Sequence, residues 1–112
     1  MKIKILIIFL VVVNCIFVYS QEDKIEIKKT YYPNGIIKTE GSYTNGKLNG
    51  TYREYYPNGK IWKAWNFVDG KEDGTSFWYF EDGKLSIEWN YKNGKREGIA
   101  RWYYETGELW AE

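Results

Sequence analysis

Glycines recur along this chain at a fixed interval of 24 residues, and this interval constrains the fold more than any other feature. Ten of the eleven glycines obey it, which chance would not arrange. Self-similarity at a period of about 20–50 residues is typical of repeat proteins. Tyrosines and aliphatic residues follow the same interval. The series are Gly35, Gly59, Gly83 and Gly107; Gly46, Gly70 and Gly94; Gly50, Gly74 and Gly98; Tyr31, Tyr55, Tyr79 and Tyr103; and Ile37, Ile61, Leu85 and Leu109.

Each unit of the repeat contains two turn signals, such as Asn58-Gly59 and Asp69-Gly70. Asn-Gly and Asp-Gly favour two-residue type I′ hairpin turns, because both central residues need a positive φ. The segments between the turns alternate apolar and polar residues and are rich in Tyr, Trp and Ile, as strands are. The sequence therefore predicts an all-β fold: an antiparallel meander of consecutive β-hairpins that forms an elongated, single-layer, twisted sheet.

Two-residue loops at both turns would set the register of this sheet, because each strand would then fold back onto the preceding one without a shift. A glycine that faces a tryptophan would leave room for the indole ring. The predicted facing pairs are Tyr56 with Ile61, Phe80 with Leu85, Phe67 with Glu72, Trp65 with Gly74, Trp89 with Gly98, and Gly41 with Gly50. The predicted core face collects Tyr56, Ile61, Trp65, Phe67, Trp78, Phe80, Leu85, Ile87, Trp89 and Tyr91.

The opposite face of the predicted sheet carries a second set of aromatic residues, which we take as the candidate partner-binding site. Exposed apolar patches usually mark interaction surfaces, and Tyr and Trp are frequent at interface hot spots. The alternative is that a single-layer sheet needs aromatic residues on both faces for its stability. The same register would set Trp62 across from Tyr55, and Trp110 across from Tyr103. The candidate residues are Tyr31, Tyr55, Trp62, Phe77, Tyr79, Tyr103 and Trp110.

The first twenty residues have the pattern of an export signal peptide. Lys2 and Lys4 form a basic start, and an apolar run over 5–18 precedes a cleavage site after Ser20. A spanning helix needs about 20 apolar residues, so an uncleaved anchor is the less favoured alternative. An exported protein would be periplasmic, at the cell surface or secreted. The predicted organisation is a signal peptide (1–20), an N-terminal segment (21–29) and a repeat domain of about 3.5 units (30–112).

The residue types in the chain exclude most catalytic and metal chemistry. There is no histidine, and the single cysteine, Cys15, lies within the predicted signal peptide. Histidine is the commonest general base, and His and Cys supply most zinc sites. We therefore predict no enzyme activity, no cofactor and no metal site. Sixteen Lys and Arg against fifteen Asp and Glu also argue against a nucleic-acid partner, and for weak or no membrane binding.

The repeat unit resembles the MORN (membrane occupation and recognition nexus) family, in its bacterial variant form. The shared pattern is Tyr-Tyr-x-[Asn/Asp]-Gly-Lys-[Ile/Leu], followed by [Tyr/Phe]-x-[Asn/Asp]-Gly-Lys-x-x-Gly. Residues 55–61 with 67–74 carry it, as do residues 79–85 with 91–98. The resemblance covers about residues 30–112. It implies a hairpin ribbon used for protein–protein contacts, sometimes contact with phospholipid head groups, and, for many bacterial members, the role of an antitoxin in a toxin–antitoxin pair.

These observations lead to one functional hypothesis and two alternatives. The leading hypothesis is an exported, non-catalytic repeat protein that acts as a scaffold for protein–protein interaction through its aromatic face. Self-association through the open edges of the sheet is a further expectation. The first alternative is a surface module that binds cell-wall glycan or lipid head groups. The second is an antitoxin-like partner of a toxin, which requires that the signal peptide is not used.

Overall fold

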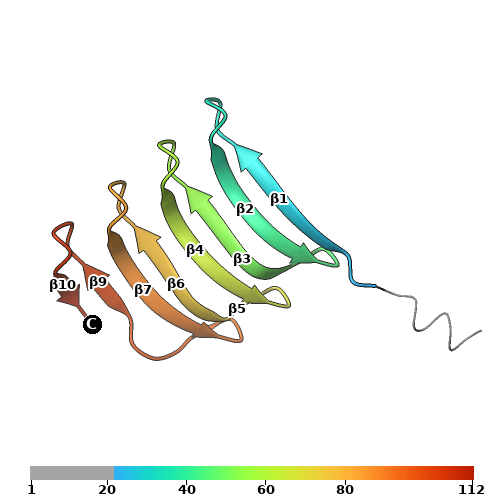
Figure 1. Ribbon diagram of the computed structural model, residues 1–112. Helices are drawn as coiled ribbons and strands as arrows, with labels where there is room; N and C mark the ends of the chain where they lie inside the picture. Colours follow the sequence, from blue (N-terminus) through green and yellow to red (C-terminus); the bar gives the residue numbers. More distant parts are fainter. Residues whose placement is uncertain (1–21) are drawn as a thin grey trace, which may run out of the picture.

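The computed structural model describes residues 22–112, which form one antiparallel sheet (Figure 1). The predicted all-β fold of consecutive hairpins is confirmed. The strands are β1 (Ile25–Tyr31), β2 (Ile37–Thr44), β3 (Lys47–Tyr55), β4 (Ile61–Val68), β5 (Lys71–Glu72), β6 (Gly74–Tyr79), β7 (Leu85–Lys92), β8 (Lys95–Arg96), β9 (Arg101–Tyr103) and β10 (Leu109–Ala111).

Neighbouring strands in the sheet follow chain order, β1-β2-β3-β4-β6-β7-β9-β10. The short strand β5 pairs with β4, and β8 pairs with β7. Figure 1 shows the hairpins side by side, with one set of loops along each side of the ribbon. Among the described residues, β1 and β10 lie at the two edges of the sheet. Because β1 starts at Ile25, the sheet begins inside the predicted N-terminal segment.

Three turns, which follow β2, β4 and β7, are the predicted two-residue type I′ turns. In the first of them Asn45 has a φ of 50° and Gly46 has a φ of 82°. Asp69-Gly70 and Asn93-Gly94 have nearly the same values. Both central residues of a type I′ turn need a positive φ, which Asn, Asp and Gly adopt at low cost.

The loops on the other side of the ribbon are longer than predicted. The N–H of Tyr56 donates to the carbonyl of Lys60 over 2.8 Å, and the N–H of Gly59 donates to the carbonyl of Tyr56 over 2.9 Å. Pro57 therefore opens a three-residue loop, as its fixed φ suits the second position of a type I turn. Only Gly59 has a positive φ, of 87°, so the predicted type I′ turn at Asn58-Gly59 is wrong. The same hydrogen bonds close the loops at 32–36, 80–84 and 104–108.

The extra loop residue changes the pairing of the residues next to the loop. Tyr55 pairs with Ile61, whereas the following pair is Glu54 with Lys63. Trp62 is left between these pairs as a β-bulge. The bulge compensates for the longer loop, so the rest of the two strands keeps the predicted register.

The bulge also changes the face on which the aliphatic residues lie. Ile61 pairs with Tyr55 in one repeat, and Leu85 pairs with Tyr79 in the next. The predicted placement of Ile61 and Leu85 on the core face is therefore wrong. So are the predicted pairs of Tyr56 with Ile61 and of Phe80 with Leu85.

The sheet also changes register after each type I′ turn. Phe67 pairs with Glu72 as predicted, but the next pair in the structure is Ala64 with Phe77. Strand β6 has thus moved by two residues relative to β4. Gly74, with a φ of 96°, is the first residue of β6, at the point where this change occurs.

This shift removes the role predicted for the glycines at 74 and 98. A Cβ atom at Gly74 would meet only Asn66, at 3.9 Å, and one at Gly98 would point into open space. The predicted pairs of Trp65 with Gly74 and of Trp89 with Gly98 are therefore wrong. Both glycines instead supply a positive φ where the strand changes register.

The most buried side chains form a row on one face of the sheet. Tyr52 pairs with Trp65, and Ser76 pairs with Trp89. The exposed fraction of Ser76 is 2 % and that of Trp89 is 8 %. We call this face the Trp face, and the opposite face, which carries Tyr55, the Tyr face.

Gly41 takes the position in this row at which the next repeat has Trp65. It pairs with Tyr52, so the predicted pair of Gly41 with Gly50 is wrong. A Cβ atom at Gly41 would lie 2.9 Å from the ring of Tyr52 and 2.9 Å from that of Tyr43. The two tyrosine rings therefore fill the space that the indole occupies in later repeats.

Candidate binding face

The Tyr face presents three rows of side chains that run across the strands. The row nearest the three-residue loops alternates tyrosine with an aliphatic residue, and we call it the tyrosine row. Its cross-strand pairs contribute about 0.2–1 kcal/mol each to the stability of the sheet. Most of its tyrosines are half-buried, while Tyr31 at the edge is 58 % exposed. The pairs are Tyr31 with Ile37, Tyr55 with Ile61, Tyr79 with Leu85, and Tyr103 with Leu109.

The second row crosses the middle of the strands, and we call it the central row. Successive members are cross-strand pairs, except at the end, where a hydrogen bond joins the last two. At the β1 end, the carboxylate of Glu40 lies 3.5 Å from the ammonium of Lys29 and 3.6 Å from the guanidinium of Arg53. The row consists of Lys29, Glu40, Arg53, Ala64, Phe77, Glu88, Arg101 and Glu112.

The other end of the central row repeats this arrangement with the signs exchanged. The guanidinium of Arg101 lies 3.0 Å from Glu88 and 2.9 Å from Glu112. Hydrogen bonds to Glu112, and then to Glu88, raise the pKa of Arg101 above its ordinary value. A cation with an anion on each side thus ends the row, as an anion with a cation on each side begins it.

The third row, nearest the type I′ turns, is polar on the inner strands, while at the β1 end Ile27 pairs with Ser42. Thr51 pairs with Asn66, and Thr75 pairs with Asn90. The hydroxyl of Thr75 donates to Oδ1 of Asn90 over 2.7 Å, and Nδ2 of Asn66 donates to the carbonyl of Asp73 over 3.0 Å. We call this the polar row.

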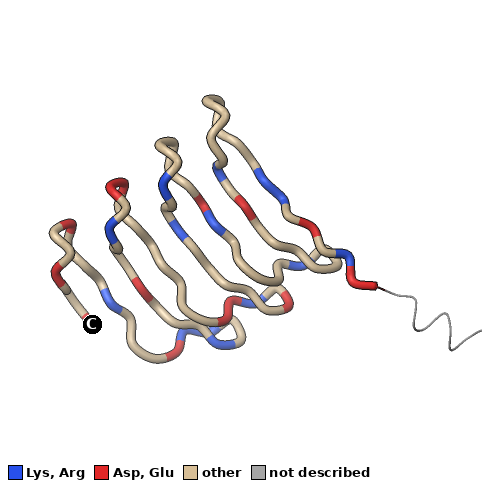
Figure 2. The backbone as a smooth tube through the Cα atoms, viewed as in Figure 1, with Lys and Arg blue, Asp and Glu red and all other residues tan. Residues whose placement is uncertain are grey.

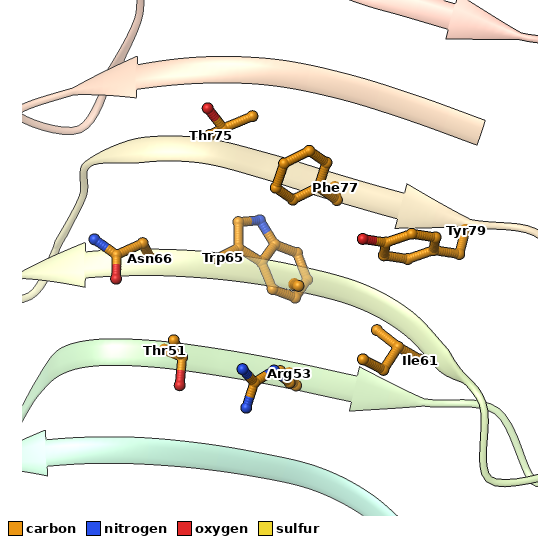
Figure 3. Close-up of a pocket in the computed structure, with 9 residues that line it drawn as sticks. Thr51, Arg53, Ile61, Trp65, Asn66, Thr75, Phe77 and Tyr79 are labelled. Atoms are coloured by element: carbon orange, nitrogen blue, oxygen red, sulfur yellow. The ribbon is translucent and has the colours of Figure 1, made fainter. Parts of the chain in front are cut away.

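A shallow depression of about 290 Å³ lies in the middle of the Tyr face (Figure 3). It forms because Ala64, whose side chain is a single methyl group, pairs with Arg53 on one side and Phe77 on the other. Ile61 and Tyr79 line it toward the tyrosine row. The lining is mostly apolar with one guanidinium, which suits a single inserted side chain.

Five of the seven predicted site residues lie on the Tyr face. Four of them are the tyrosines of the tyrosine row, and the fifth belongs to the central row. The ring of Phe77 lies 6.3 Å from that of Tyr79, so the two rows are in contact. The five residues are Tyr31, Tyr55, Phe77, Tyr79 and Tyr103.

The two predicted tryptophans lie on the Trp face instead. The ring of Trp62 lies 5.7 Å from that of Tyr56, because the β-bulge turns the indole away from Tyr55. Trp110 has the same contact with its own neighbouring tyrosine, Tyr104, at 6.3 Å. The predicted positions of Trp62 across from Tyr55 and of Trp110 across from Tyr103 are therefore wrong.

A cluster around Lys63 on the Trp face was not predicted from the sequence. The ammonium of Lys63 lies 4.0 Å from the ring centre of Trp62, 4.3 Å from that of Trp78, and 4.0 Å from the carboxylate of Glu54. Cation–π contacts contribute about 0.5–2 kcal/mol, more as the cation is desolvated. No simple pattern in the sequence marks this cluster, because it depends on the bulge at Trp62, which brings the side chains of Trp62 and Lys63 together.

Side chains of the three-residue loops connect successive repeats. The hydroxyl of Tyr56 donates to the carbonyl of Tyr79 over 2.6 Å, and the ammonium of Lys60 donates to the carbonyl of Asp82 over 3.1 Å. The ammonium of Lys84 donates to the carbonyl of Glu105 over 3.1 Å, so it also reaches the loop of the following repeat. Figure 2 shows charges of both signs along the whole ribbon. Lys60 and Lys84 thus join one repeat to the next.

Within residues 22–112, no group of three or more His, Cys, Asp or Glu side chains is placed to hold a metal ion. The same part of the chain contains no helix that is long and apolar enough to cross a membrane. The predicted signal peptide, residues 1–20, lies outside the described residues.

The chain matches one known family of repeats. The family model, described as MORN repeat variant, matches residues 27–45, 48–69, 72–93 and 96–112. Each matched segment contains one three-residue loop and the strands on either side of it. No curated protein and no solved structure matches the chain significantly. Because the four consecutive matches cover well over half of the sequence, the chain belongs to the family of the MORN repeat variant.

Proposed function

We propose that this protein is an exported, non-catalytic scaffold that binds a protein partner through its Tyr face. MORN repeats suggest a repeat-based binding module, and the arrangement of the Tyr face supports this particular use. The observation that carries the proposal is the tyrosine row beside the depression at Ala64. Regularly spaced aromatic rings next to a socket for one side chain suit an extended polypeptide better than a small molecule.

The chemistry of the face also favours protein as the partner. Tyrosine and arginine are enriched at interface hot spots, where a polar group and a large contact area occur together. The central row adds charges of both signs, which provide register for a partner of complementary pattern. An anionic membrane would need a surplus of cations, and the central row contains three cations and three anions.

The proposal is tested by affinity capture from a cell-envelope extract. The probe is the purified protein, and the test variant replaces Tyr55, Tyr79 and Tyr103 by Ala. The matched control replaces Trp62 and Trp110 by Ala, which removes exposed aromatic rings from the other face. We expect a protein that the parent and the tryptophan variant capture in a stoichiometric amount, and that the tyrosine variant loses. Circular dichroism verifies that both variants remain folded.

Three results would contradict this assignment. Loss of the captured protein with the tryptophan variant alone would move the binding site to the Trp face. Capture of wall glycan or of lipid, without a stoichiometric protein, would favour the alternative of a surface module. Equal capture by all three proteins would exclude both aromatic faces as the site of binding.

Export is tested by locating the protein in fractionated cells of its source. We expect it outside the cytosol, with an N-terminus that begins at Gln21 after removal of the signal peptide. A cytosolic protein with an intact N-terminus would contradict export and favour the antitoxin-like alternative.

A further inference from the structure

The central row has a sign pattern that is complementary to its own reverse. Two cations with an anion between them occupy one end, and two anions with a cation between them occupy the other. The uncharged pair Ala64 and Phe77 separates the two ends. Read backwards, the row presents an anion wherever the forward row has a cation, and Phe77 wherever it has Ala64.

We propose that a second copy of this chain packs on the Tyr face, related by a two-fold axis. The axis runs parallel to the strands, between β4 and β6, so that each row lies opposite its own reverse. This inference rests on the proposed function, because it names the partner of the same face. Such an interface is isologous, since both copies use the same residues and the contact closes on itself.

The two-fold arrangement pairs every charge of the central row with an opposite charge. Arg53 meets Glu88 of the second copy, and Glu40 meets Arg101. Next to the axis, Phe77 enters the depression at Ala64 of the second copy, and the reverse occurs on the other side of the axis. Like charges meet nowhere in the row, so the interface incurs no repulsion of the kind that separates wrong partners.

The other two rows of the Tyr face agree with the same axis. In the tyrosine row, each tyrosine meets an aliphatic residue: Tyr55 meets Leu85 of the second copy, and Tyr79 meets Ile61. In the polar row, Thr51 meets Asn90 of the second copy, so that a hydroxyl lies opposite an amide. All three rows are therefore compatible with one placement of the second copy.

The Trp face lacks this property. The same operation would place Tyr52 against Trp89 of the second copy, so that a large ring would meet a large ring. Gly41, in the same row, would meet the residue next to Arg101, Ala100, so that a small residue would meet a small one. The Trp face therefore does not fit its own reverse, and the complementarity is specific to the Tyr face.

The area of the Tyr face is adequate for a stable contact. Strands are about 4.8 Å apart and rows about 6.8 Å apart, so the three rows cover roughly 700–800 Å² of the sheet. A standard interface buries about 800 Å² on each partner. Twisted sheets pack face to face at about 10 Å with their strands within about 30° of each other, which two strand-parallel copies satisfy.

Sedimentation and light scattering of the purified protein test the proposal. We expect a dimer that dissociates on dilution and, because opposite charges meet across the axis, dissociates more readily at high salt. Ala64→Phe places two phenylalanines in contact, and Phe77→Ala leaves two empty depressions in contact. Each single variant should weaken the dimer by about tenfold or more.

The exchange of both residues, Ala64→Phe with Phe77→Ala, provides the decisive variant. It restores a ring opposite a methyl group across the axis, so the dimer should regain most of the parent's affinity. Trp62→Ala is the matched control from the Trp face and should leave the dimer unchanged. Circular dichroism of each variant separates loss of the dimer from loss of the fold.

A parent protein that is monomeric at about 1 mM would overturn the proposal. A double variant whose dimer is no tighter than that of the single variants would also overturn it. The proposed binding of another protein and the proposed self-association are distinguished by two further outcomes. A monomeric parent that still captures a protein through the tyrosine row would overturn self-association and leave the proposed scaffold intact. A dimer that forms as described, with capture unaffected by the tyrosine variant, would support self-association and overturn the binding of another protein there.

Discussion

Tyr56 shows how much a single atom contributes to the contact between repeats. Its hydroxyl donates to the carbonyl of Tyr79, whereas the equivalent residue of the next repeat, Phe80, has the same ring without the hydroxyl. Burial raises the pKa of Tyr56, and the nearby carboxylates of Glu81 and Asp82 raise it further. The folded state therefore favours the neutral phenol.

Replacing Tyr56 by Phe should lower the free energy of unfolding by about 0.5–1.5 kcal/mol near neutral pH, because one hydrogen bond is lost. Above a pH of about 10, the unfolded chain of the parent releases the phenol proton before the folded chain does, so the parent loses stability as pH rises. The variant lacks this loss. Urea unfolding, followed by tryptophan fluorescence, measures the free energy of unfolding of the parent and the variant near neutral pH and above a pH of about 10. The difference between the two proteins should be smaller at the higher pH. A constant difference would contradict the raised pKa.

At the scale of the strand pair, two pairs on the Trp face each join a large residue to a small one. Ser76, which is buried, pairs with Trp89, and Gly41 pairs with Tyr52. The rings of Tyr52 and Trp65, which also pair, lie 5.7 Å apart and tilted, so each position must match the space its neighbours leave, because protein interiors leave few voids. The first repeat thus has the small residue, Gly41, where a later repeat has Trp89, and the large residue, Tyr52, where the next repeat has Ser76.

Gly41→Trp introduces the residue that the next repeat has at this position, yet it should destabilise the protein by about 1–3 kcal/mol, because Tyr52 already fills the space. Adding Tyr52→Ser produces the combination of Trp and Ser found between Trp89 and Ser76. The double variant should therefore regain much of the lost stability. Thermal unfolding of the parent, both single variants and the double variant measures the coupling. Simple additivity of the two single effects would show that the two positions do not share this space.

The sequence predicted the hairpins and the type I′ turns because these depend on local chemistry. Asn45-Gly46 can adopt two positive φ angles, and the structure shows that it does. The sequence did not predict the three-residue loops, since Asn58-Gly59 is the same dipeptide as Asn45-Gly46 and also favours a type I′ turn. Pro33 and Pro57 were an overlooked indication in two of the four loops, because a fixed φ favours a type I turn. The other two loops have Glu81 and Glu105 at this position. The bulge at Trp62 follows from the loop that begins at Pro57.

The candidate site was predicted in part for the same reason. Tyr55 and Tyr79 precede the loop, and their strands are paired on both sides of the register shift, so these tyrosines kept the predicted face. Trp62 is the bulge residue itself, where an error of one residue transfers a side chain to the other face. The depression at Ala64 could not be predicted, because it depends on the two-residue shift of β6, which involves contacts between β4 and β6.

At the scale of the whole molecule, stability should vary along the ribbon. Each repeat is stabilised by its neighbours, so inner strands are held on two sides and edge strands on one. Strands β9 and β10 have three residues each, against eight in β4. The central hairpins should therefore open last.

Amide hydrogen exchange should follow this order, with the slowest exchange in β3, β4, β6 and β7 and the fastest in β1, β9 and β10. The expected pattern is a gradient from the middle of the sheet toward both edges. Mass spectrometry of peptides from the exchanged protein measures it. Uniform protection along the sheet would contradict nearest-neighbour stabilisation and indicate that the whole ribbon unfolds as one unit.

The loop contacts that join the repeats also bear on how a gene for such a protein can change in length. Tyr32 donates to the carbonyl of Tyr55, and Tyr56 to that of Tyr79, each across 23 residues. A duplicated segment of 24 codons would therefore encode a hairpin with its donors and acceptors already in place on both sides. The duplication would preserve the fold, yet it would move Ala64 and Phe77 away from the middle of the charged row. Lengthening of the gene and retention of the two-fold contact are thus in conflict.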